Sequence, residues 1–405
     1  MPSLPPVLAS LSRHKLTALL LILQVSLTCA IVCNVAFMII HRTAQLHQPS
    51  GVAEDELVMI DSSDLDDNAQ PLVRHATDLA ALRGIPGVRS AAAVDALPFN
   101  RRDWSNGISL SQDAPAPASA TAFNGTPGEL TTLGVQLVEG RDFLPDEYVP
   151  VDSAHDWAGI DHVPVTIITR ALADKLFPGQ DPLGKAIYPD EKPVRIVGVV
   201  DHLVRPHTHE DDSSEYATLL PMLPDSNTVT YLLRTSPPDR ERVLKQAADV
   251  LNGLNANRIL QHAQTFAQLR ADYFHRSRSM IGLLIAAALG LFAVTIIGIA
   301  GLANFWVQQR RRSIGIRRAL GATRSDILRY FQGENLLIVG AGVVLGALFA
   351  CLLNLALMMY YEQSRLPPAY LAIGAFSLWL LGQLAVLGPA LRAAAVPPVV
   401  ATRSA

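Results

Sequence analysis

Two long runs without a charged residue constrain the fold more than any other feature of this sequence. Residues 280–307 and residues 336–360 contain no Lys, Arg, Asp or Glu. Each run exceeds the roughly 20 residues that an α-helix needs to cross a bilayer core of about 30 Å. The connection between them, residues 308–332, carries seven arginines and one acid, Asp326. Because short Arg-rich connections stay on the cytoplasmic side, the runs predict two membrane spans joined by a cytoplasmic loop.

The same criterion predicts two further spans. Residues 16–40 are uncharged and follow Arg13, His14 and Lys15, and residues 370–391 form the last apolar run. A cleaved signal peptide is the alternative for residues 16–40, but the apolar core of such a peptide is usually only about 7–15 residues long. We therefore expect an uncleaved first span whose N-terminus lies inside the cell, and four spans in total.

The span count predicts a domain order for the whole chain, with its largest part outside the cytoplasm. The predicted order is a cytoplasmic N-terminus (1–15), span 1 (16–40), an outer domain with a stalk (41–278), span 2 (279–307), a cytoplasmic coupling loop (308–332), span 3 (333–360), an outer turn (361–369), span 4 (370–391) and a cytoplasmic tail (392–405).

The outer domain is predicted to have an α+β fold. Amphipathic or capped helices are expected at 71–82 and 239–254, short strands at 163–169, 194–200, 217–220 and 228–233, a Pro/Ala/Ser-rich loop at 111–122, and a helical stalk at 265–279. Of 36 acids in the chain, 33 lie between Glu54 and Asp272. An acidic outer domain with an Arg-rich inner face excludes a nucleic-acid binder. All three cysteines lie in predicted spans, so no disulfide framework is expected in the domain.

The Arg-rich loop also carries apolar residues at helical spacing. Ile316–Leu320 and Ile327–Phe331 repeat at that spacing, and Gly321-Ala322-Thr323 interrupts them. This pattern predicts a short amphipathic helix under the membrane, followed by a second helix that enters it. One interpretation is a docking surface for a cytoplasmic partner. The alternative is that the arginines serve only as a topology signal.

The string RRRSIGIRRALGATRSDILRYFQGEN, residues 310–335, resembles the signature of the FtsX/MacB-like permeases of ABC transporters. In that family the loop forms a coupling helix on the ATPase subunit and precedes a helix that carries a Glu, here Glu334. Ser313 stands where the family usually has an acid, whereas the hydrophobic residues Ile314 and Ile316 are retained. The resemblance implies an ATPase-coupling segment made of Arg311, Arg312, Ile314, Gly315, Ile316, Arg317, Arg318, Leu320, Gly321 and Ala322.

The resemblance extends beyond the loop. EGRDF (139–143), ITRALADKLFPGQDPLGKAI (168–187) and VRIVGVVDH (194–202) are similar, in this order, to landmarks of the MacB-type periplasmic core domain, and PALRAAAVPPVVATR (389–403) is similar to the family's usual ending. The resemblance therefore implies a multi-pass protein of the inner membrane with a periplasmic domain.

Other chemistry has little support. The sequence from Gly179 to Lys185 matches the spacing of a phosphate-binding loop, but Ala186 replaces the hydroxyl residue that would hold Mg²⁺. A turn after a helix is therefore the preferred interpretation. A permease of this kind would then require an ATPase on a separate chain. The acidic and histidine-rich stretch 202–212 lacks the spacing of a structural zinc site. We expect no cofactor, no metal and no catalytic residue, hence a non-enzymatic subunit.

Two features of the spans bear on assembly. They contain no ionisable residue away from their ends, which argues against an ion-coupled transporter. Gly342 and Gly346 form a GxxxG pattern that permits close helix packing, either within one chain or at a dimer seam.

The family resemblance implies mechanotransmission, in which ATP hydrolysis moves the outer domain and substrate need not pass through the spans. The implied partners are an ABC ATPase, a second permease in a homodimer or heterodimer, and a periplasmic adaptor with an outer-membrane duct. An FtsX-like transducer that regulates an envelope partner without transport is the alternative, and a sensor without an ATPase is a third.

Overall fold

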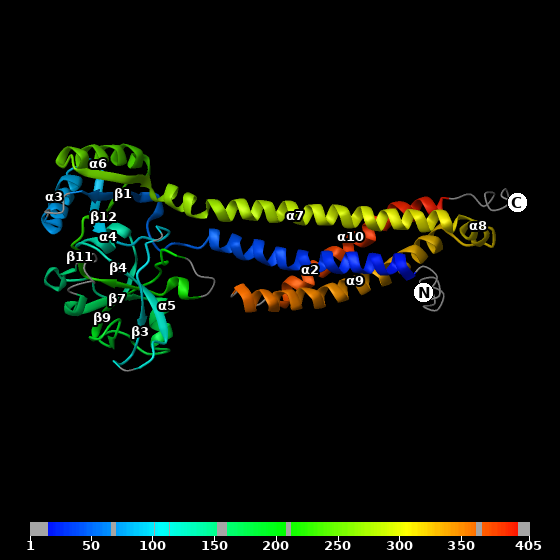
Figure 1. Cartoon of the computed structure of the whole chain (residues 1–405), viewed down its shortest axis with the longest axis horizontal. Coiled ribbons are helices and arrows are strands. Elements are labelled where there is room, and N and C mark those ends of the chain that lie inside the picture. Colours follow the sequence, from blue (N-terminus) through cyan, green and yellow to red (C-terminus); the bar gives the residue numbers. More distant parts are fainter. Residues whose placement is uncertain are drawn as a thin grey trace. The chain divides into compact units, whose positions relative to one another are not determined.

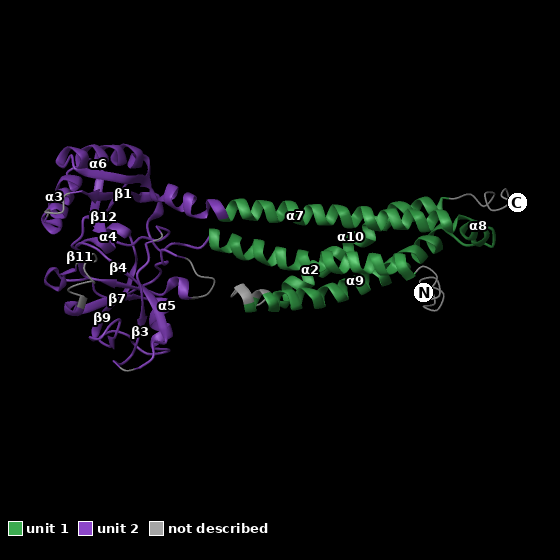
Figure 2. Cartoon of the chain, in the orientation of Figure 1, with its two compact units in different colours: residues 1–46, 277–405 green, residues 47–276 purple. Residues whose placement is uncertain are grey.

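A computed structural model describes residues 15–65, 70–100, 102–112, 114–151, 160–207, 212–361 and 367–395. The chain divides into two compact units (Figure 2): unit 1 comprises residues 1–46 and 277–405, and unit 2 comprises residues 47–276. Unit 1 is helical, and unit 2 combines sheets with short helices (Figure 1). The predicted cytoplasmic N-terminus before Lys15, most of the predicted outer turn and the last part of the tail lie outside the described residues.

Among the described residues, four helices of unit 1 are long and apolar enough to cross a membrane, which confirms the predicted fold class. They are α2 (Lys15–Leu46), α7 (Phe266–Gln309), α9 (Arg324–Tyr361) and α10 (Pro368–Ala394), with α8 (Arg311–Ala319) between α7 and α9. Helix α9 begins at Arg324, well before the expected start of the third span near Glu334. The helix begins before the apolar run because the polar residues that precede the run are helical too, and the first turn is capped.

Close packing inside unit 1 depends on small residues. A Cβ placed on Gly342 would lie 2.8 Å from the Val25 side chain, and one on Gly346 would lie 2.4 Å from Cβ of Cys29. Gly374 meets Cys33 of α2 in the same way. The GxxxG pattern of α9 is therefore used within the chain, where it lets α9 approach α2, and the intramolecular interpretation is the one that the structure supports.

Polar side chains add specific contacts between the apolar helices. The hydroxyl groups of Thr28 on α2 and Thr295 on α7 lie 2.9 Å apart, and Asn335 on α9 donates to the Gly382 carbonyl of α10 at 2.9 Å. Helices α2, α9 and α10 pack against one another, whereas the most apolar stretch of α7 is almost entirely exposed within this chain. The described apolar surface of α7 is thus left to lipid or to other protein.

Among its described residues, unit 2 contains thirteen strands and four α-helices besides the first turns of α7. The strands are β1 (Leu57–Asp64), β2 (Val88–Val94), β3 (Ser105–Ile108), β4 (Ala118–Asn124), β5 (Leu137–Gly140), β6 (Val149–Val151), β7 (Val165–Thr169), β8 (Ala186–Ile187), β9 (Val194–Val200), β10 (Ala217–Leu220), β11 (Met222–Pro224), β12 (Thr228–Thr235) and β13 (Arg258–Thr265); the helices are α3 (Pro71–Arg83), α4 (Glu129–Leu133), α5 (Arg170–Leu176) and α6 (Arg240–Leu254).

One sheet of unit 2 is antiparallel and has the order β13-β1-β12-β2. Apolar residues of these strands form a core with Leu79 and Leu82 of α3 and with Val243 and Leu251 of α6. These helical residues recur at the three- to four-residue spacing of one helix face, so α3 and α6 bury their apolar sides against the sheet. The strand that follows α2 and the strand that precedes α7 are neighbours in this sheet.

The second sheet is mixed and has the order β3-β4-β10-β7-β9-β5, with β8 added beside β9. Its central strand β7 is buried along its whole length, and β11 and β6 form a separate parallel pair. Backbone pairing of Val94 with Gly125, together with the hydrogen bond from Thr126 N–H to the Ala93 carbonyl (2.9 Å), joins the end of β2 to the end of β4. The two sheets are therefore joined by main-chain hydrogen bonds.

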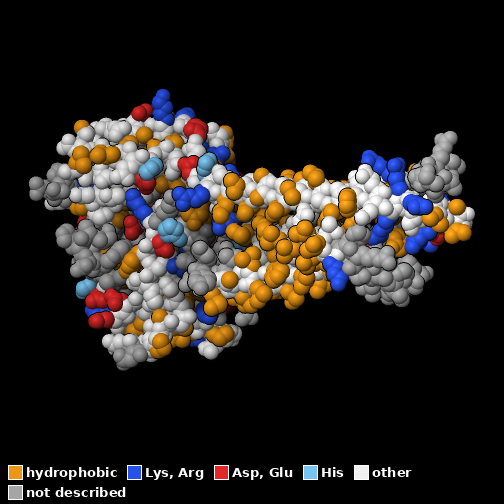
Figure 3. Space-filling model, turned by 45° about the vertical axis from the view of Figure 1, so that its right-hand side comes forward, with side chains coloured by type: hydrophobic (Ala, Val, Ile, Leu, Met, Phe, Trp, Pro, Cys, Tyr) orange, Lys and Arg blue, Asp and Glu red, His pale blue; other side chains and the backbone are white. Residues whose placement is uncertain are grey.

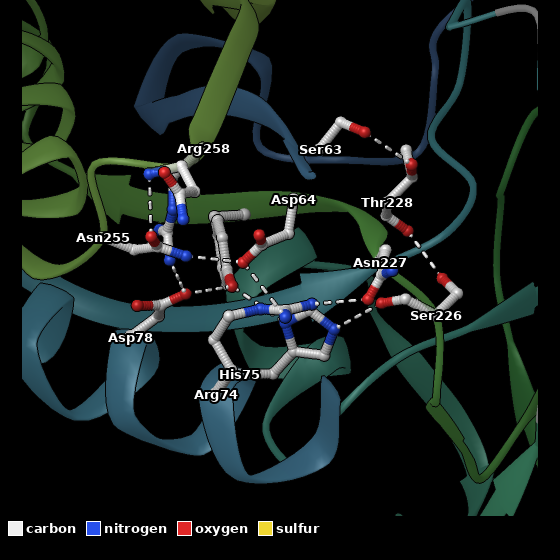
Figure 4. Close-up of polar contacts among 12 residues, drawn as sticks. Ser63, Asp64, Arg74, His75, Asp78, Ser226, Asn227, Thr228, Asn255 and Arg258 are labelled. Carbon is white, nitrogen blue, oxygen red and sulfur yellow. Dashed lines mark hydrogen bonds and ion pairs between the residues drawn. The ribbon is translucent and has the colours of Figure 1, made fainter. Parts of the chain in front are cut away.

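A buried polar network ties β13 and α3 together (Figure 4). Arg258 and Asp78 form an ion pair of 2.7 Å, and their side chains are only 1% and 2% exposed. The Tyr231 hydroxyl also donates to Asp78, and His75 lies between that hydroxyl (2.8 Å) and the Ser226 carbonyl (3.0 Å). The ion pair offsets part of the large desolvation cost that either buried charge would carry alone. The network fixes the first residue of β13.

The structure corrects one part of the predicted element map. The stretch 111–122 was expected to be a Pro/Ala/Ser-rich loop, but its second half begins strand β4 at Ala118. Pairing with β3 on one side and β10 on the other buries Thr121 and Phe123, so tertiary contacts override the weak strand preference of Ala and Ser.

Candidate functional site

The candidate coupling segment comprises α8 and the turn that joins it to α9. The C-terminus of α8 closes on Gly321, whose φ of +98° is in the left-handed region. The Gly321 N–H donates to the Arg318 carbonyl (3.2 Å), and the Ala322 N–H donates to the Arg317 carbonyl (3.0 Å). This pair of bonds is a Schellman motif, which satisfies the last carbonyls of a helix and favours glycine at the left-handed position. The glycine therefore ends α8 at a fixed point.

Helix α9 starts immediately after this turn through a reciprocal cap. The Thr323 hydroxyl accepts a hydrogen bond from the Asp326 N–H (3.2 Å), and the Asp326 carboxylate accepts one from the Thr323 N–H (3.0 Å). Such a capping box satisfies donors that the first turn of a helix leaves free. Since both helix ends are closed by specific hydrogen bonds, the turn between α8 and α9 has a defined geometry. The short helix and the break at 321–323 were both expected from the sequence.

The two isoleucines of the segment lie in different environments. Ile314 is 6% exposed and packs in the core of unit 1 with Trp306, Ile327 and Phe331. Ile316 is 48% exposed, and Leu320 is 83% exposed. The Ile314 side chain thus holds α8 against the bundle, whereas Ile316 is not part of that core. The apolar surface available to a partner consists of Ile316 and Leu320.

The arginine directly before the segment is paired with the acid on α9. Arg310 pairs with Glu334 at 2.7 Å, and the Glu334 side chain is 2% exposed. Glu334 belongs to the pattern of the family resemblance, but no local pattern in the chain identifies Arg310 as its partner. The ion pair joins the end of α7 to α9, directly before α8. A buried carboxylate needs such a partner, so the residue at 310 fixes where α8 begins.

Two more arginines brace α8 from its other side. The Arg317 guanidinium lies 5.0 Å from the centre of the Tyr330 ring, and Arg318 donates to the Ala394 carbonyl of α10 at 3.1 Å. The side chains of four further arginines are exposed: Arg311, Arg312, Arg324 and Arg329. Figure 3 shows Lys and Arg side chains gathered at the end of the bundle that carries α8, beyond the hydrophobic surface of the helices. The segment thus presents positive charge beside two exposed apolar side chains.

A small cavity lies behind the segment, between Trp306, Glu334 and Asn335. Its volume of about 10 Å³ is enough for roughly one water molecule. The indole N–H of Trp306 is buried and has no hydrogen-bond partner among the described residues. The cavity can therefore hold a bridging water but is too small for a substrate.

The structure also settles the other motifs. Gly179 and Gly184 both have positive φ and form a turn between α5 and β8, where Lys185 donates to Gln180 at 2.7 Å and covers the Phe177 ring. This is the turn that we preferred over a phosphate-binding loop. In the stretch 202–212, His202 pairs with Glu215 at 3.0 Å, which raises the pKa of His202. His209, Glu210 and Asp211 lie outside the described residues, and no metal-ligating group of three side chains occurs among the described ones.

Comparisons with known proteins cover both units. A family model described as the MacB-like periplasmic core domain matches residues 21–249, and one described as the FtsX-like permease C-terminal region matches residues 281–398. The macrolide export ATP-binding/permease protein MacB of Bartonella henselae is 32% identical over 231 residues, which cover 54% of this chain and 32% of that protein. The chain therefore spans about a third of the length of this relative.

Two further similarities are to proteins named YknZ. The uncharacterized ABC transporter permease YknZ of Bacillus subtilis is 23% identical over 274 residues, or 66% of this chain and 63% of that protein. The solved extracellular domain of a YknZ from Gram-positive bacteria aligns at 17% identity over 50% of this chain and 100% of that one, with a TM-score of 0.32.

Proposed function

Because the chain belongs to the ABC transporter permeases that combine a MacB-like periplasmic core domain with an FtsX-like permease region, we propose that it couples ATP hydrolysis by an ATPase to movement of that domain. The chain itself is a multi-pass membrane protein whose soluble domain is periplasmic. These 405 residues contain no phosphate-binding loop with its terminal Ser or Thr. The proposal therefore places ATP hydrolysis outside these residues, on an ATPase that docks on them.

The observation that carries the proposal is the surface of α8. Ile316 and Leu320 are exposed on a short helix whose position is fixed at both ends by hydrogen bonds, by the Arg310–Glu334 pair and by the buried Ile314. Exposed apolar side chains surrounded by arginines are typical of a protein interface, where a few buried anchors supply most of the binding energy. The rigid attachment matters because a load applied to α8 then reaches α9 and α7 directly.

The proposed work of the transporter is export by mechanotransmission. Several polar groups of the described spans bond to neighbouring helices: Thr28 to Thr295, Asn34 to the Ala350 carbonyl and Asn335 to the Gly382 carbonyl. Substrate is accordingly handled by the periplasmic domain, together with a second permease and, in a MacB-like assembly, an adaptor and an outer-membrane duct. The named relative MacB is a macrolide exporter, and the substrate class of this chain is left open by the proposal.

Co-purification from native membranes tests the proposal. An affinity-tagged chain should retain an ABC ATPase, and the double variant Ile316→Glu/Leu320→Glu should lose it. Loss of a hot spot worth about 2 kcal/mol weakens binding roughly 30-fold. Val73→Glu is the matched control, since Val73 is a similarly exposed apolar residue on α3 of unit 2.

The other co-purified proteins separate the remaining functions. An adaptor protein supports export, whereas an envelope hydrolase supports the FtsX-like transducer. Retention of the ATPase at the wild-type level by the double variant contradicts the assignment of α8 as the coupling surface.

A further inference from the structure

Arg270, on the second turn of α7, contacts both segments through which unit 2 is connected to the membrane helices. Its guanidinium group forms an ion pair with Glu54 and donates to the Gln48 carbonyl at 2.7 Å. The same group lies 5.1 Å from the centre of the Phe99 ring and 5.8 Å from that of Phe274. Gln48 and Glu54 belong to the connecting segment, residues 47–56, which joins α2 to β1. One side chain thus links that segment to α7.

The connecting segment is itself bound to the body of unit 2. The Ala53 N–H donates to the Leu133 carbonyl at 2.8 Å, and the Val204 N–H donates to the Ser50 carbonyl at 3.0 Å. At Gly51, φ is +84° and an added Cβ would lie 2.1 Å from the His202 carbonyl oxygen. Only glycine fits where the backbone passes this close to another chain segment. The connecting segment, which carries both acceptors of Arg270, is therefore held in place by contacts that do not involve Arg270.

The first turns of α7 are held equally firmly. The Thr265 hydroxyl accepts a hydrogen bond from the Gln268 N–H (3.2 Å), and the Gln268 side chain accepts one from the Thr265 N–H (2.8 Å), which caps the helix directly after β13. The Phe99 ring packs against Phe266 and Phe274 with ring centres 6.1 and 5.3 Å apart.

Phe99 adopts a conformation that is unusual for its residue type. Its φ is +67°, and its side chain is 1% exposed. A positive φ in a bulky residue is strained, and such strain persists only where the surroundings hold it in place. The aromatic contacts with α7 supply that support. The Phe99 ring therefore forms a fixed packing surface for the first turns of α7.

We propose that Arg270 is a positioning residue that locks the start of α7 to the connecting segment, so that both membrane connections of unit 2 move as one rigid body. The consequence for transport rests on the proposed function: with a free hinge at either connection, movement of the spans would be absorbed before it reached the sheets. Since β1 and β13 are hydrogen-bonded neighbours, a load that enters through the locked pair is distributed into a single sheet.

Arginine is required for this role because of its shape as well as its charge. A planar guanidinium can bond two acceptors and stack on aromatic rings at the same time, whereas the ammonium group of lysine is a compact point charge. Arg270→Lys should therefore keep the attraction to Glu54 but release the stacking and the bond to Gln48, and its effect should lie between those of wild type and Arg270→Ala.

Spin-label distance measurements on the full chain in lipid nanodiscs, without any ATPase, test the proposal. Labels at Lys245→Cys on α6 and Arg276→Cys on α7 both lie on exposed positions of unit 2, and Cys351→Ser removes the exposed natural thiol. The wild-type distance distribution should be narrow, and Arg270→Ala should broaden it while the melting temperature of unit 2 changes little. Glu54→Gln should broaden it in the same direction, and Arg270→Lys should give a width between those of wild type and Arg270→Ala.

An unchanged distribution in a folded Arg270→Ala or Glu54→Gln protein overturns the proposal. If Arg270→Ala fails to fold, the milder Glu54→Gln variant decides the outcome. The result is independent of the co-purification experiment. A locked α7 in a chain that binds no ATPase would contradict the proposed function alone, and a bound ATPase with a freely hinged α7 would contradict only the role of Arg270.

Discussion

Glu129, the first residue of α4, gives unit 2 a testable dependence on pH. Its side chain is 1% exposed, and neither carboxylate oxygen has a hydrogen-bond partner among the described residues. The carboxyl carbon lies 3.0 Å from the position that a Cβ on Gly125 would occupy, at the junction of the two sheets. Burial, followed by the nearby carboxylates of Asp142 and Asp95, raises the pKa of Glu129 to about 8. The carboxyl group is therefore protonated in the folded protein at neutral pH.

The expected effect on stability follows from the two pKa values. The pKa of Glu129 is raised from 4.5 in the unfolded chain to about 8 in the folded protein, so its contribution to stability is fully present below pH 4.5 and is lost as pH rises to 8. One pKa unit corresponds to about 1.4 kcal/mol, so the free energy of unfolding should fall by about 3 kcal/mol between pH 4.5 and pH 7 and by about 5 kcal/mol in all.

Urea unfolding of the full chain in detergent micelles measures this effect. Equilibrium samples between pH 5 and pH 8 are pulse-labelled with deuterium, and peptides from β2 and β4 report the unfolding of unit 2. Glu129→Gln preserves the shape of the side chain but cannot ionise. The wild type should lose stability relative to this variant by about 1.4 kcal/mol for each pH unit.

A matched control has the opposite sign. The hydrogen bonds from Arg141 lower the pKa of Glu147, so the contribution of Glu147 is present above pH 4.5 and is lost only as pH falls below it. The difference between wild type and Glu147→Gln should therefore stay constant from pH 5 to pH 8. A constant difference for Glu129→Gln over the same range would refute the reasoning about its burial.

Three further substitutions have expected results. Glu334→Ala leaves Arg310 without its buried partner and should lower the free energy of unfolding of the bundle by about 3–5 kcal/mol, as measured in micelles. Replacing both residues with apolar ones should restore most of that free energy. Asp78→Asn should cost unit 2 a similar amount because it breaks the buried pair with Arg258. Asp239→Asn, which breaks the exposed pair with Arg242, should change the stability much less in the same urea assay. Gly321→Ala meets no steric contact but must adopt a positive φ, so it should cost about 1–2 kcal/mol and increase hydrogen exchange at the end of α8.

The elements that could be predicted from the sequence are those whose signal is local. Residues 194–200 and 217–220 have the bounds of β9 and β10, and α3 and α6 lie within a residue or two of the expected helices. Each of these elements is a continuous apolar or periodic run that ends at Gly, Pro or polar residues, so its neighbours in the chain decide its structure. Strand β4 escaped prediction because pairing partners distant in the chain stabilise it.

The coupling segment shows the same limit at the level of single residues. Ile314 and Ile316 are two positions apart, which is about 200° around a helix, so they cannot face the same partner. That arithmetic was available from the sequence and would have separated the buried residue from the exposed one. The pairing of Arg310 with Glu334 could not be predicted, because any of seven arginines could pair with Glu334 until the packing of α7 against α9 is known.

The adjacency of β1 and β13 has a consequence for how this chain could be rebuilt. Val58 is paired with Thr265, so the polypeptide enters and leaves unit 2 at almost the same point. A domain whose ends meet can be cut out or exchanged without stretching the protein that hosts it. We therefore expect residues 47–276 to be exchangeable as one unit, and we expect related membrane proteins to carry different domains between the same two helices.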